Sequence, residues 1–137
     1  RVLQIFGSDI VGEWVRRSRV NLEAAGPGDC VRLDRADVLE RTPPAAEGVM
    51  VANPPYGVRI GEAEELAAFY PRLGDALKQR WGGWRCYFFT ADTALPKLMG
   101  LKATRRTPLF NGALECRLYE YRMVAGSNRD RPPRPAD

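Results

Sequence analysis

Apolar residues follow two kinds of pattern along this chain. Short continuous apolar runs are typical of strands buried inside a sheet, whereas apolar residues three or four positions apart indicate amphipathic helices. The order of these patterns predicts an α/β sandwich with a mostly parallel sheet and one reversed strand. Predicted strands span residues 2–6, 30–33, 49–52, 85–90, 102–109 and 113–121, and predicted helices span 11–25, 62–80 and 95–100.

Glycine and proline refine the two longer helices. Gly26 is expected to end the first helix, whose apolar side would hold Trp14, Val15 and Leu22. Pro71 interrupts the helical pattern of 62–80, so we expect either a kink or a new helix that begins near this residue.

The last two strands flank Phe110-Asn111-Gly112. Asn-Gly between two strands is a strong signal for a β-hairpin, so we expect a C-terminal antiparallel hairpin with its turn at these three residues. The turn alone would account for this segment, and a place beside a functional site is the alternative.

Length and composition favour one folded domain. The chain has 137 residues, of which 45% are hydrophobic and 28% charged, values that are ordinary for a globular protein. We expect one folded domain over residues 1–124 and a disordered Arg/Pro-rich tail or linker over 125–137. The formal net charge of +4 permits an RNA or DNA partner without requiring one.

The counts of histidine and cysteine limit the possible chemistry. The sequence has no histidine, which excludes a Ser-His-Asp or Cys-His catalytic site and a histidine metal site within these residues. Cys30, Cys86 and Cys116 lie far apart in segments that resemble strands. We therefore expect buried free thiols in a reducing compartment, and so a cytoplasmic protein.

Asn53-Pro54-Pro55-Tyr56 follows the apolar run 49–52 directly. Proline has no amide hydrogen to donate and favours extended backbone in the residue before it, so this strand should stop abruptly with Asn53 held at its carboxyl end. In open α/β sheets, ligands bind at that end of the strands. The alternative is an ordinary Pro-Pro turn before a glycine.

These four residues suit methylation of the exocyclic amine of a nucleobase. Such an amine is a poor nucleophile, and the Asn53 side-chain oxygen together with the Pro54 carbonyl could accept both of its hydrogens and direct its lone pair at a methyl donor. Tyr56 offers a flat face on which a flipped-out base can stack. A strong base is unnecessary, because the amine can lose its proton after the transfer.

Two aspartates follow earlier predicted strands. Asp9 ends a predicted turn over 7–9 and could either cap the first helix or bind the ribose hydroxyls of a nucleoside cofactor. Asp37 follows the strand 30–33 and could either accept a hydrogen bond from a cofactor's adenine amine or lie in a solvated turn.

Four segments together resemble one family, the catalytic domain of bacterial large-subunit ribosomal RNA guanine-N2 methyltransferases, which are THUMP-associated enzymes often labelled N6-adenine-specific DNA methylases. The resemblance covers roughly residues 4–122, and the last segment is the most specific to the family. The segments are Gly7-Ser8-Asp9-Ile10, Asn53-Pro54-Pro55-Tyr56-Gly57, residues 73–80, and Leu109-Phe110-Asn111-Gly112-Ala113-Leu114-Glu115-Cys116.

The resemblance implies a class I, Rossmann-like methyltransferase fold that uses S-adenosylmethionine. It implies that Asp9 and Ile10 bind near the cofactor ribose, that Asp37 binds the adenine, and that Asn53 contacts both cofactor and target. The target guanine amine would lie among Asn53, Pro54, Pro55 and Tyr56. Phe110 and Asn111 would lie beside the active site as substrate contacts.

The same resemblance places two elements upstream of Arg1. One is the first strand with its Gly-rich cofactor loop, which would lie between the strands 2–6 and 49–52, and the other is an RNA-binding THUMP region. We therefore expect a fragment with two open strand edges that binds the cofactor poorly by itself. Val11 and Gly12 also stand where the family usually has an acidic residue and a proline.

These observations predict transfer of a methyl group from S-adenosylmethionine to guanine N2 in large-subunit ribosomal RNA. An adenine-N6 methyltransferase acting on DNA or RNA would share the chemistry of Asn53 to Tyr56. A fragment that binds nucleic acid without catalysis is the third hypothesis.

Overall fold

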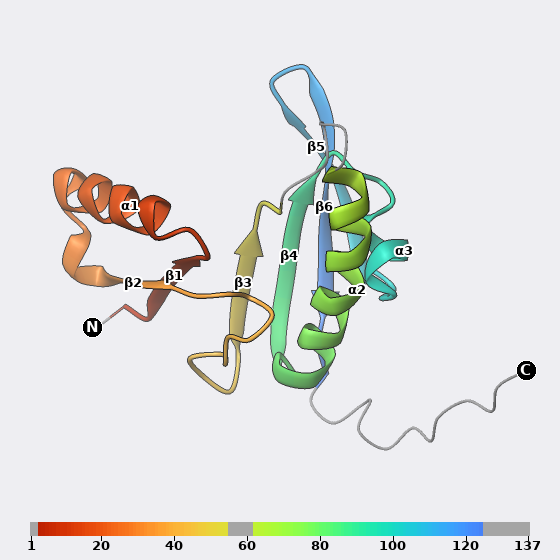
Figure 1. Cartoon of the computed structure of the whole chain (residues 1–137), viewed down its shortest axis with the longest axis horizontal. Coiled ribbons are helices and arrows are strands. Elements are labelled where there is room, and N and C mark those ends of the chain that lie inside the picture. Colours follow the sequence, from red (N-terminus) through yellow and green to blue (C-terminus); the bar gives the residue numbers. More distant parts are fainter. Residues whose placement is uncertain (1–2, 55–61, 125–137) are drawn as a thin grey trace, which may run out of the picture. The chain divides into compact units, whose positions relative to one another are not determined.

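A computed structural model of the chain describes residues 3–54 and 62–124. Its contacts divide the chain into two compact units, Arg1–Pro44 and Ala45–Asp137, which are described separately as the N-terminal and the C-terminal unit (Figure 1). Pro55, Tyr56 and the expected disordered tail lie outside the described residues.

The N-terminal unit is a two-stranded parallel sheet with one helix. Its elements are β1 (Ile5–Asp9), α1 (Gly12–Ala25), a 3-10 turn η1 (Gly28–Cys30) and β2 (Val31–Arg35). The predicted end of the first strand at residue 6 is wrong. Gly7, Ser8 and Asp9 continue β1 instead of forming a turn, because they pair in register with the last three residues of β2.

Helix α1 packs only part of its predicted apolar side. Of the three residues predicted for this side, Val15 is buried and Leu22 is half-buried, but Trp14 is 50% exposed. The Trp14 ring instead has the guanidinium carbon of Arg17 at 5.0 Å from its centroid. Gly26 ends the helix as predicted, in a left-handed conformation with a φ of 103°.

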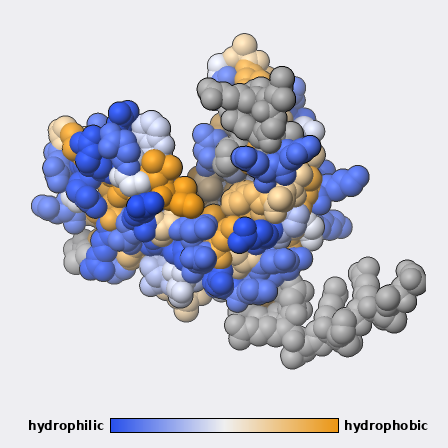
Figure 2. Space-filling model, viewed as in Figure 1, coloured by the Kyte–Doolittle hydropathy of each residue, from blue (hydrophilic) through white to orange (hydrophobic). Residues whose placement is uncertain are grey.

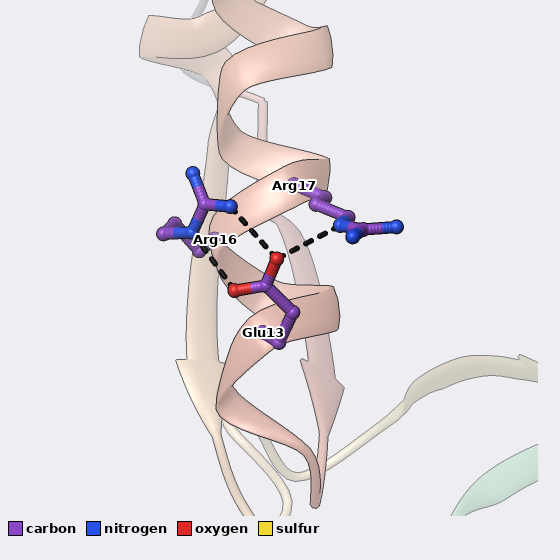
Figure 3. Close-up of polar contacts among 3 residues, drawn as sticks. All are labelled: Glu13, Arg16 and Arg17. Carbon is purple, nitrogen blue, oxygen red and sulfur yellow. Dashed lines mark hydrogen bonds and ion pairs between the residues drawn. The ribbon is translucent and has the colours of Figure 1, made fainter.

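Glu13 organises the exposed face of the first turns of α1. Its carboxylate accepts hydrogen bonds from Arg16, the shorter at 2.7 Å, and from Arg17 at 2.9 Å (Figure 3). The hydrogen bonds from Arg16 and then Arg17 lower the pKa of Glu13 from 4.5 to about 2. The cluster therefore keeps its charges down to strongly acidic pH.

The C-terminal unit is a four-stranded mixed sheet with two helices. Its strands are β3 (Gly48–Ala52), β4 (Trp84–Thr90), β5 (Arg105–Asn111) and β6 (Leu114–Arg122), in the order β3-β4-β6-β5. β3 and β4 are parallel, whereas β6 is antiparallel to both β4 and β5. The predicted C-terminal hairpin with one reversed strand is therefore confirmed.

The hairpin turn lies further along the chain than predicted. Phe110 and Asn111 belong to β5, because they pair with Glu115 and Leu114 of β6, and the turn consists of Gly112 and Ala113. Gly112 has a φ of 61°, a left-handed conformation that glycine adopts without strain.

Most of the core lies between this sheet and its helices, α2 (Glu62–Arg80) and α3 (Leu95–Met99). α2 is one helix with Pro71 inside it, so the alternative of a new helix starting there is wrong. The expected helical apolar stripe is confirmed, since Tyr70, Leu73 and Leu77 are at most 1% exposed. Every second residue of β4 is also buried, and these residues are Trp84, Cys86, Phe88 and Thr90.

Apolar side chains also reach the surface, as Figure 2 shows on one face of the molecule. β1 and β3 each lie at the edge of their own sheet, with Ile5 45%, Val49 61% and Val51 72% exposed. Open strand edges and apolar surface were both expected. A further strand between them remains a prediction. In the described part of the chain, no helix is both long and apolar enough to cross a membrane.

The cysteine prediction is confirmed for two residues and wrong for one. Cys86 and Cys116 are buried free thiols in β4 and β6. Cys30 is exposed, because it ends the 3-10 turn before β2 instead of beginning the strand.

Candidate active site

Asn53 and Pro54 directly follow the carboxyl end of β3. The last pair of the parallel ladder joins Ala52 to Phe88, so both residues lie at the sheet edge where β3 and β4 end. Pro54 is buried and Asn53 is exposed. The Asn53 side chain forms no hydrogen bond with any described residue, which leaves its amide oxygen available to accept one from a ligand.

A second polar segment ends β4 at the same edge. The buried Thr90 hydroxyl oxygen accepts a hydrogen bond from the Asp92 amide at 3.0 Å, and the Asp92 carboxylate accepts one from the Ala94 amide at 2.9 Å. These two bonds determine the course of the chain from β4 to α3. This segment was not predicted, although its sequence carries the same signal as Asn53, namely polar residues immediately after a buried apolar run.

Three buried tyrosines of the C-terminal unit are held neutral. Burial raises the pKa of Tyr70 to about 12, with a smaller contribution from Asp92. Burial also raises the pKa of Tyr119 and of Tyr121. None of these hydroxyls would be ionised near neutral pH, so they can donate hydrogen bonds but cannot act as general bases there.

The β5–β6 hairpin extends beyond the same edge of the sheet. Pairing of β4 with β6 stops at Thr90 and Arg117, whereas β5 and β6 continue to pair as far as Asn111 and Leu114. Because β6 is antiparallel to β4, the part of β6 that precedes Arg117 lies past the carboxyl end of β4. The structure therefore brings Phe110 and Asn111 to the side of the sheet that holds Asn53.

Asp9 and Ile10 follow the carboxyl end of β1, in the N-terminal unit. The Asp9 carboxylate accepts a hydrogen bond from the Val11 amide at 2.8 Å. Val11 is the residue just before α1, and its own side chain does not cap the helix. Asp9 thus holds the turn before the helix. The Arg35 side chain supports this turn by donating a hydrogen bond to the Ile10 carbonyl at 3.0 Å, a role that the sequence did not reveal.

Asp37 lies at the same edge of the β1–β2 sheet. The Ala36 amide donates to the Asp9 carbonyl at 3.0 Å, which carries the pairing of the two strands one residue past Arg35. The half-buried Asp37 carboxylate accepts a hydrogen bond from the Leu39 amide at 2.9 Å. A carboxylate has several acceptor positions, so both aspartates keep capacity for a ligand beyond their local turn.

The predicted residues thus form two groups. Asp9, Ile10 and Asp37 meet at the carboxyl edge of the two-stranded sheet, and Asn53 and Pro54 share the corresponding edge of the four-stranded sheet with the hairpin. Both groups occupy the end of parallel strands at which α/β proteins bind ligands.

Comparison with known proteins finds a family match over most of the chain. Residues 1–120 match the UPF0020 family, an RMKL-like methyltransferase domain. The "Ribosomal RNA large subunit methyltransferase K/L" of Shewanella frigidimarina is 39% identical over 127 residues, which cover 93% of this chain and 18% of that protein.

Two solved structures are similar in both sequence and fold. One is a proposed methyltransferase in complex with SAH, with a TM-score of 0.81 and 29% identity over 89% of this chain and 32% of the other. The second is a predicted N6-adenine-specific DNA methylase from Listeria monocytogenes, with a TM-score of 0.76 and 30% identity over 88% of this chain and 30% of the other. The chain therefore spans about a third or less of each of these proteins.

Proposed function

Because this chain belongs to the RMKL-like methyltransferase domain family, we propose that it forms the base-binding part and some of the cofactor-binding part of an RNA methyltransferase. The cofactor is S-adenosylmethionine, and the target is the exocyclic N2 amine of a guanine in large-subunit ribosomal RNA. The observation that carries the proposal is the position of Asn53 and Pro54 at the carboxyl end of β3, within the residues that match the family.

Asn53 and Pro54 orient the amine in this proposal. The guanine amine donates one hydrogen to the Asn53 side-chain oxygen and the other to the Pro54 carbonyl, which directs the nitrogen lone pair at the methyl group. The nitrogen then attacks the methyl carbon as the bond from that carbon to the sulfonium sulfur breaks. The methylated amine releases its extra proton to solvent.

Asp9, Ile10 and Asp37 are the proposed cofactor contacts of the N-terminal unit. Asp9 would accept hydrogen bonds from the ribose hydroxyls, with Ile10 beside them, and Asp37 would accept one from the adenine amine. Their shared place at the edge of the β1–β2 sheet supports this assignment. SAH, bound in one similar structure, is S-adenosylmethionine after it has lost its methyl group.

The RNA would be held from two sides. Pro55 and Tyr56 continue the segment that begins at Asn53, and Tyr56 is the proposed stacking surface for the flipped base. Phe110 and Asn111 are proposed as substrate contacts from the hairpin. Upstream, an RNA-binding THUMP region is the proposed partner of this chain in the full-length protein.

The second candidate function is methylation of adenine N6. One specific observation favours it, namely the similarity to the structure described as an N6-adenine-specific DNA methylase. Adenine N6 is also an exocyclic amine, so the same two acceptors would serve. A role in nucleic-acid binding without methyl transfer is the remaining alternative.

The decisive experiment uses the full-length protein with radiolabelled S-adenosylmethionine and unmodified large-subunit ribosomal RNA. After digestion to nucleosides, label in N2-methylguanosine would support the proposal. Label in N6-methyladenosine would favour the second candidate. No label in RNA, or in DNA assayed in parallel, would leave only the binding role.

Two variants separate chemistry from cofactor binding. Asn53→Ala should lower turnover by orders of magnitude while leaving the cofactor Kd nearly unchanged. Asp9→Asn keeps an oxygen for the Val11 amide but removes the charge, so it should weaken cofactor binding by roughly tenfold or more. Asn21→Ala and Asp29→Asn, at exposed positions elsewhere in the N-terminal unit, are the matched controls. A large loss of cofactor affinity in Asn53→Ala would mean that Asn53 has been given the wrong role.

A further inference from the structure

The end of the β5–β6 hairpin, residues 108–116, forms a two-stranded ribbon without pairing to β4. Three of its apolar side chains are exposed, since Leu109 is 40%, Phe110 69% and Leu114 45% exposed. A largely exposed phenylalanine beyond the end of the sheet contributes little to the core. Its aromatic face is open to a ligand.

The hairpin is also the basic part of the chain. Residues 101–124 include five basic residues and two acidic ones, whereas the whole chain has 21 basic and 17 acidic residues. Most of the positive excess of the chain therefore belongs to this hairpin and its approach. The basic residues are Lys102, Arg105, Arg106, Arg117 and Arg122, and the acidic residues are Glu115 and Glu120.

Strand register places three of the relevant side chains on one face. Arg106 is opposite Tyr119, Pro108 is opposite Arg117, and Phe110 is opposite Glu115. Residues two apart on a strand share a face, so Arg106, Arg117 and Phe110 are on the same face of the hairpin. Both arginines act electrostatically on the Tyr119 hydroxyl and lower its pKa against the effect of burial, which agrees with this placement.

The two arginines differ in their partners. Arg117 donates to the Glu115 carboxylate at 2.8 Å and to the Cys116 carbonyl at 3.3 Å. Arg106 is exposed and forms no ion pair or hydrogen bond with any described residue. Its guanidinium, with five donors in a planar fork, is therefore available to a phosphate.

We propose that the face of the hairpin with Arg106, Arg117 and Phe110 binds the single-stranded RNA next to the target nucleotide. Phe110 stacks on a base beside the one being methylated, and Arg106 binds a backbone phosphate, while Arg117 lies between them paired with Glu115. The inference rests on the proposed function and extends its RNA site from Asn53 to the hairpin.

The geometry fits an extended strand better than a duplex. Arg106 and Phe110 are four residues apart on one strand, which corresponds to about 13 Å. A positive groove that follows the backbone, combined with aromatic residues on which bases stack, is the usual way in which proteins bind single strands. In a duplex, a base would first have to be unpaired and unstacked before it could stack on Phe110, which costs free energy.

Adjacent residues on the opposite face provide matched controls. Arg106→Gln is compared with Arg105→Gln, and Phe110→Ala with Leu109→Ala, since successive side chains of β5 point to opposite faces. All four positions are exposed, so the variants should fold. Thermal unfolding of each variant of the full-length protein checks this.

The measurement is the Kd for a fluorescently labelled single-stranded RNA that contains the target nucleotide, determined by anisotropy at several salt concentrations. Phe110→Ala should weaken binding roughly tenfold at every salt concentration. Arg106→Gln should weaken binding several-fold at low salt and reduce the slope of log K against log salt by about one. Both control variants should bind like the unmodified protein.

Two results would overturn the inference. Equal effects of Arg105→Gln and Arg106→Gln on affinity and salt slope would mean that the charge of this face has no special role. A loss of thermal stability in Phe110→Ala without a loss of RNA affinity would mean that another part of the protein covers this side chain. Because RNA affinity is measured without methyl transfer, failure of the hairpin site is distinct from failure of the proposed function, which the nucleoside analysis tests.

Discussion

The two units differ in how much of their own core they contain. The N-terminal unit buries only Val15 and Leu39 among its described hydrophobic residues, and it leaves Ile5, Trp14 and Val20 about half exposed. The C-terminal unit buries a continuous set from its sheet and helices. Its fully buried large side chains are Tyr70, Leu73, Leu77, Phe88, Leu95, Met99, Tyr119 and Tyr121.

This difference indicates how each unit is stabilised. A four-stranded sheet with two helices can bury enough apolar surface to stabilise itself, whereas a two-stranded sheet with one helix is marginal without further contacts. The proposed chemistry at Asn53 therefore belongs to the better packed unit. The proposed cofactor contacts at Asp9 and Asp37 belong to the unit that depends on contacts beyond its own residues.

The largest expected contrast comes from one core truncation in each unit. Leu73→Ala should lower the free energy of unfolding by about 3 kcal/mol, because it empties a fully buried position of α2. Val15→Ala should cost about 1.5 kcal/mol, since it removes fewer atoms from the less enclosed α1. Urea unfolding of both variants measures the difference. Equal losses of unfolding free energy in the two variants would contradict the conclusion that the C-terminal unit is the better packed one.

Two glycine variants test the packing of each unit by adding a Cβ atom, whereas the core truncations remove atoms. A Cβ added at Gly74 would collide with the Met99 carbonyl of α3, so Gly74→Ala should cost about 1–3 kcal/mol. A Cβ at Gly7 would lie 2.8 Å from the end of the Leu33 side chain, which can move. Gly7→Ala should therefore cost less than about 1 kcal/mol. Thermal unfolding measures the stability loss of each variant. A larger loss in Gly7→Ala than in Gly74→Ala would mean that the N-terminal unit is the more tightly packed one.

Alkaline pH should act through the C-terminal unit. Burial raises the pKa of the Cys86 thiol from 9.0 to about 12, so its contribution to stability is complete below pH 9 and is lost as pH rises from 9 towards 12. The loss from this residue should reach about 1 kcal/mol by pH 10. Thermal unfolding between about pH 8 and pH 10 should show a decline in melting temperature that Cys86→Ala reduces. Cys30→Ala, at an exposed position, is the control and should leave the decline unchanged.

The smallest expected effect concerns the exposed cluster of α1. The pKa of Glu13 is lowered to about 2, so any stabilisation that it gives is present above pH 4.5 and lost as pH falls from 4.5 towards 2. Because the group is fully exposed, Glu13→Gln should change the melting temperature only slightly at neutral pH, and less in high salt. A large change that persists in high salt would contradict this.

Periodicity and turn chemistry identified most of the elements. The apolar spacing of Tyr70, Leu73 and Leu77 predicted α2, Gly26 predicted the end of α1, and the Asn111-Gly112 pair predicted the hairpin. These are local signals, since they depend on the preferences of neighbouring residues. Local signals were weaker at element ends, where ladder pairing extended β1 to Asp9 and β5 to Asn111.

The candidate site was also visible in part. Polar residues directly after apolar runs marked Asn53, Asp9 and Asp37, and the structure places each at the carboxyl end of a parallel strand or just past it. The contributions of Arg35 and of the hairpin face of Arg106 were not visible, because they depend on a hydrogen bond and on a cross-strand register between residues distant in the sequence. Thr90 is different, since its hydroxyl bonds to the Asp92 amide only two residues away and the segment carried the same local signal as Asn53.

The sequence by itself determined the types of element and their order, and it singled out Asn53 and Pro54 as candidate contacts of an exocyclic amine. These features follow from local geometry and from the chemistry of single side chains. Only the tertiary structure decided that Trp14 faces solvent, that Cys30 lies outside the core, and that Arg106 shares a face with Phe110. Burial and strand register depend on which segments meet in the folded chain, and a one-residue change in pairing would exchange the two faces of the hairpin.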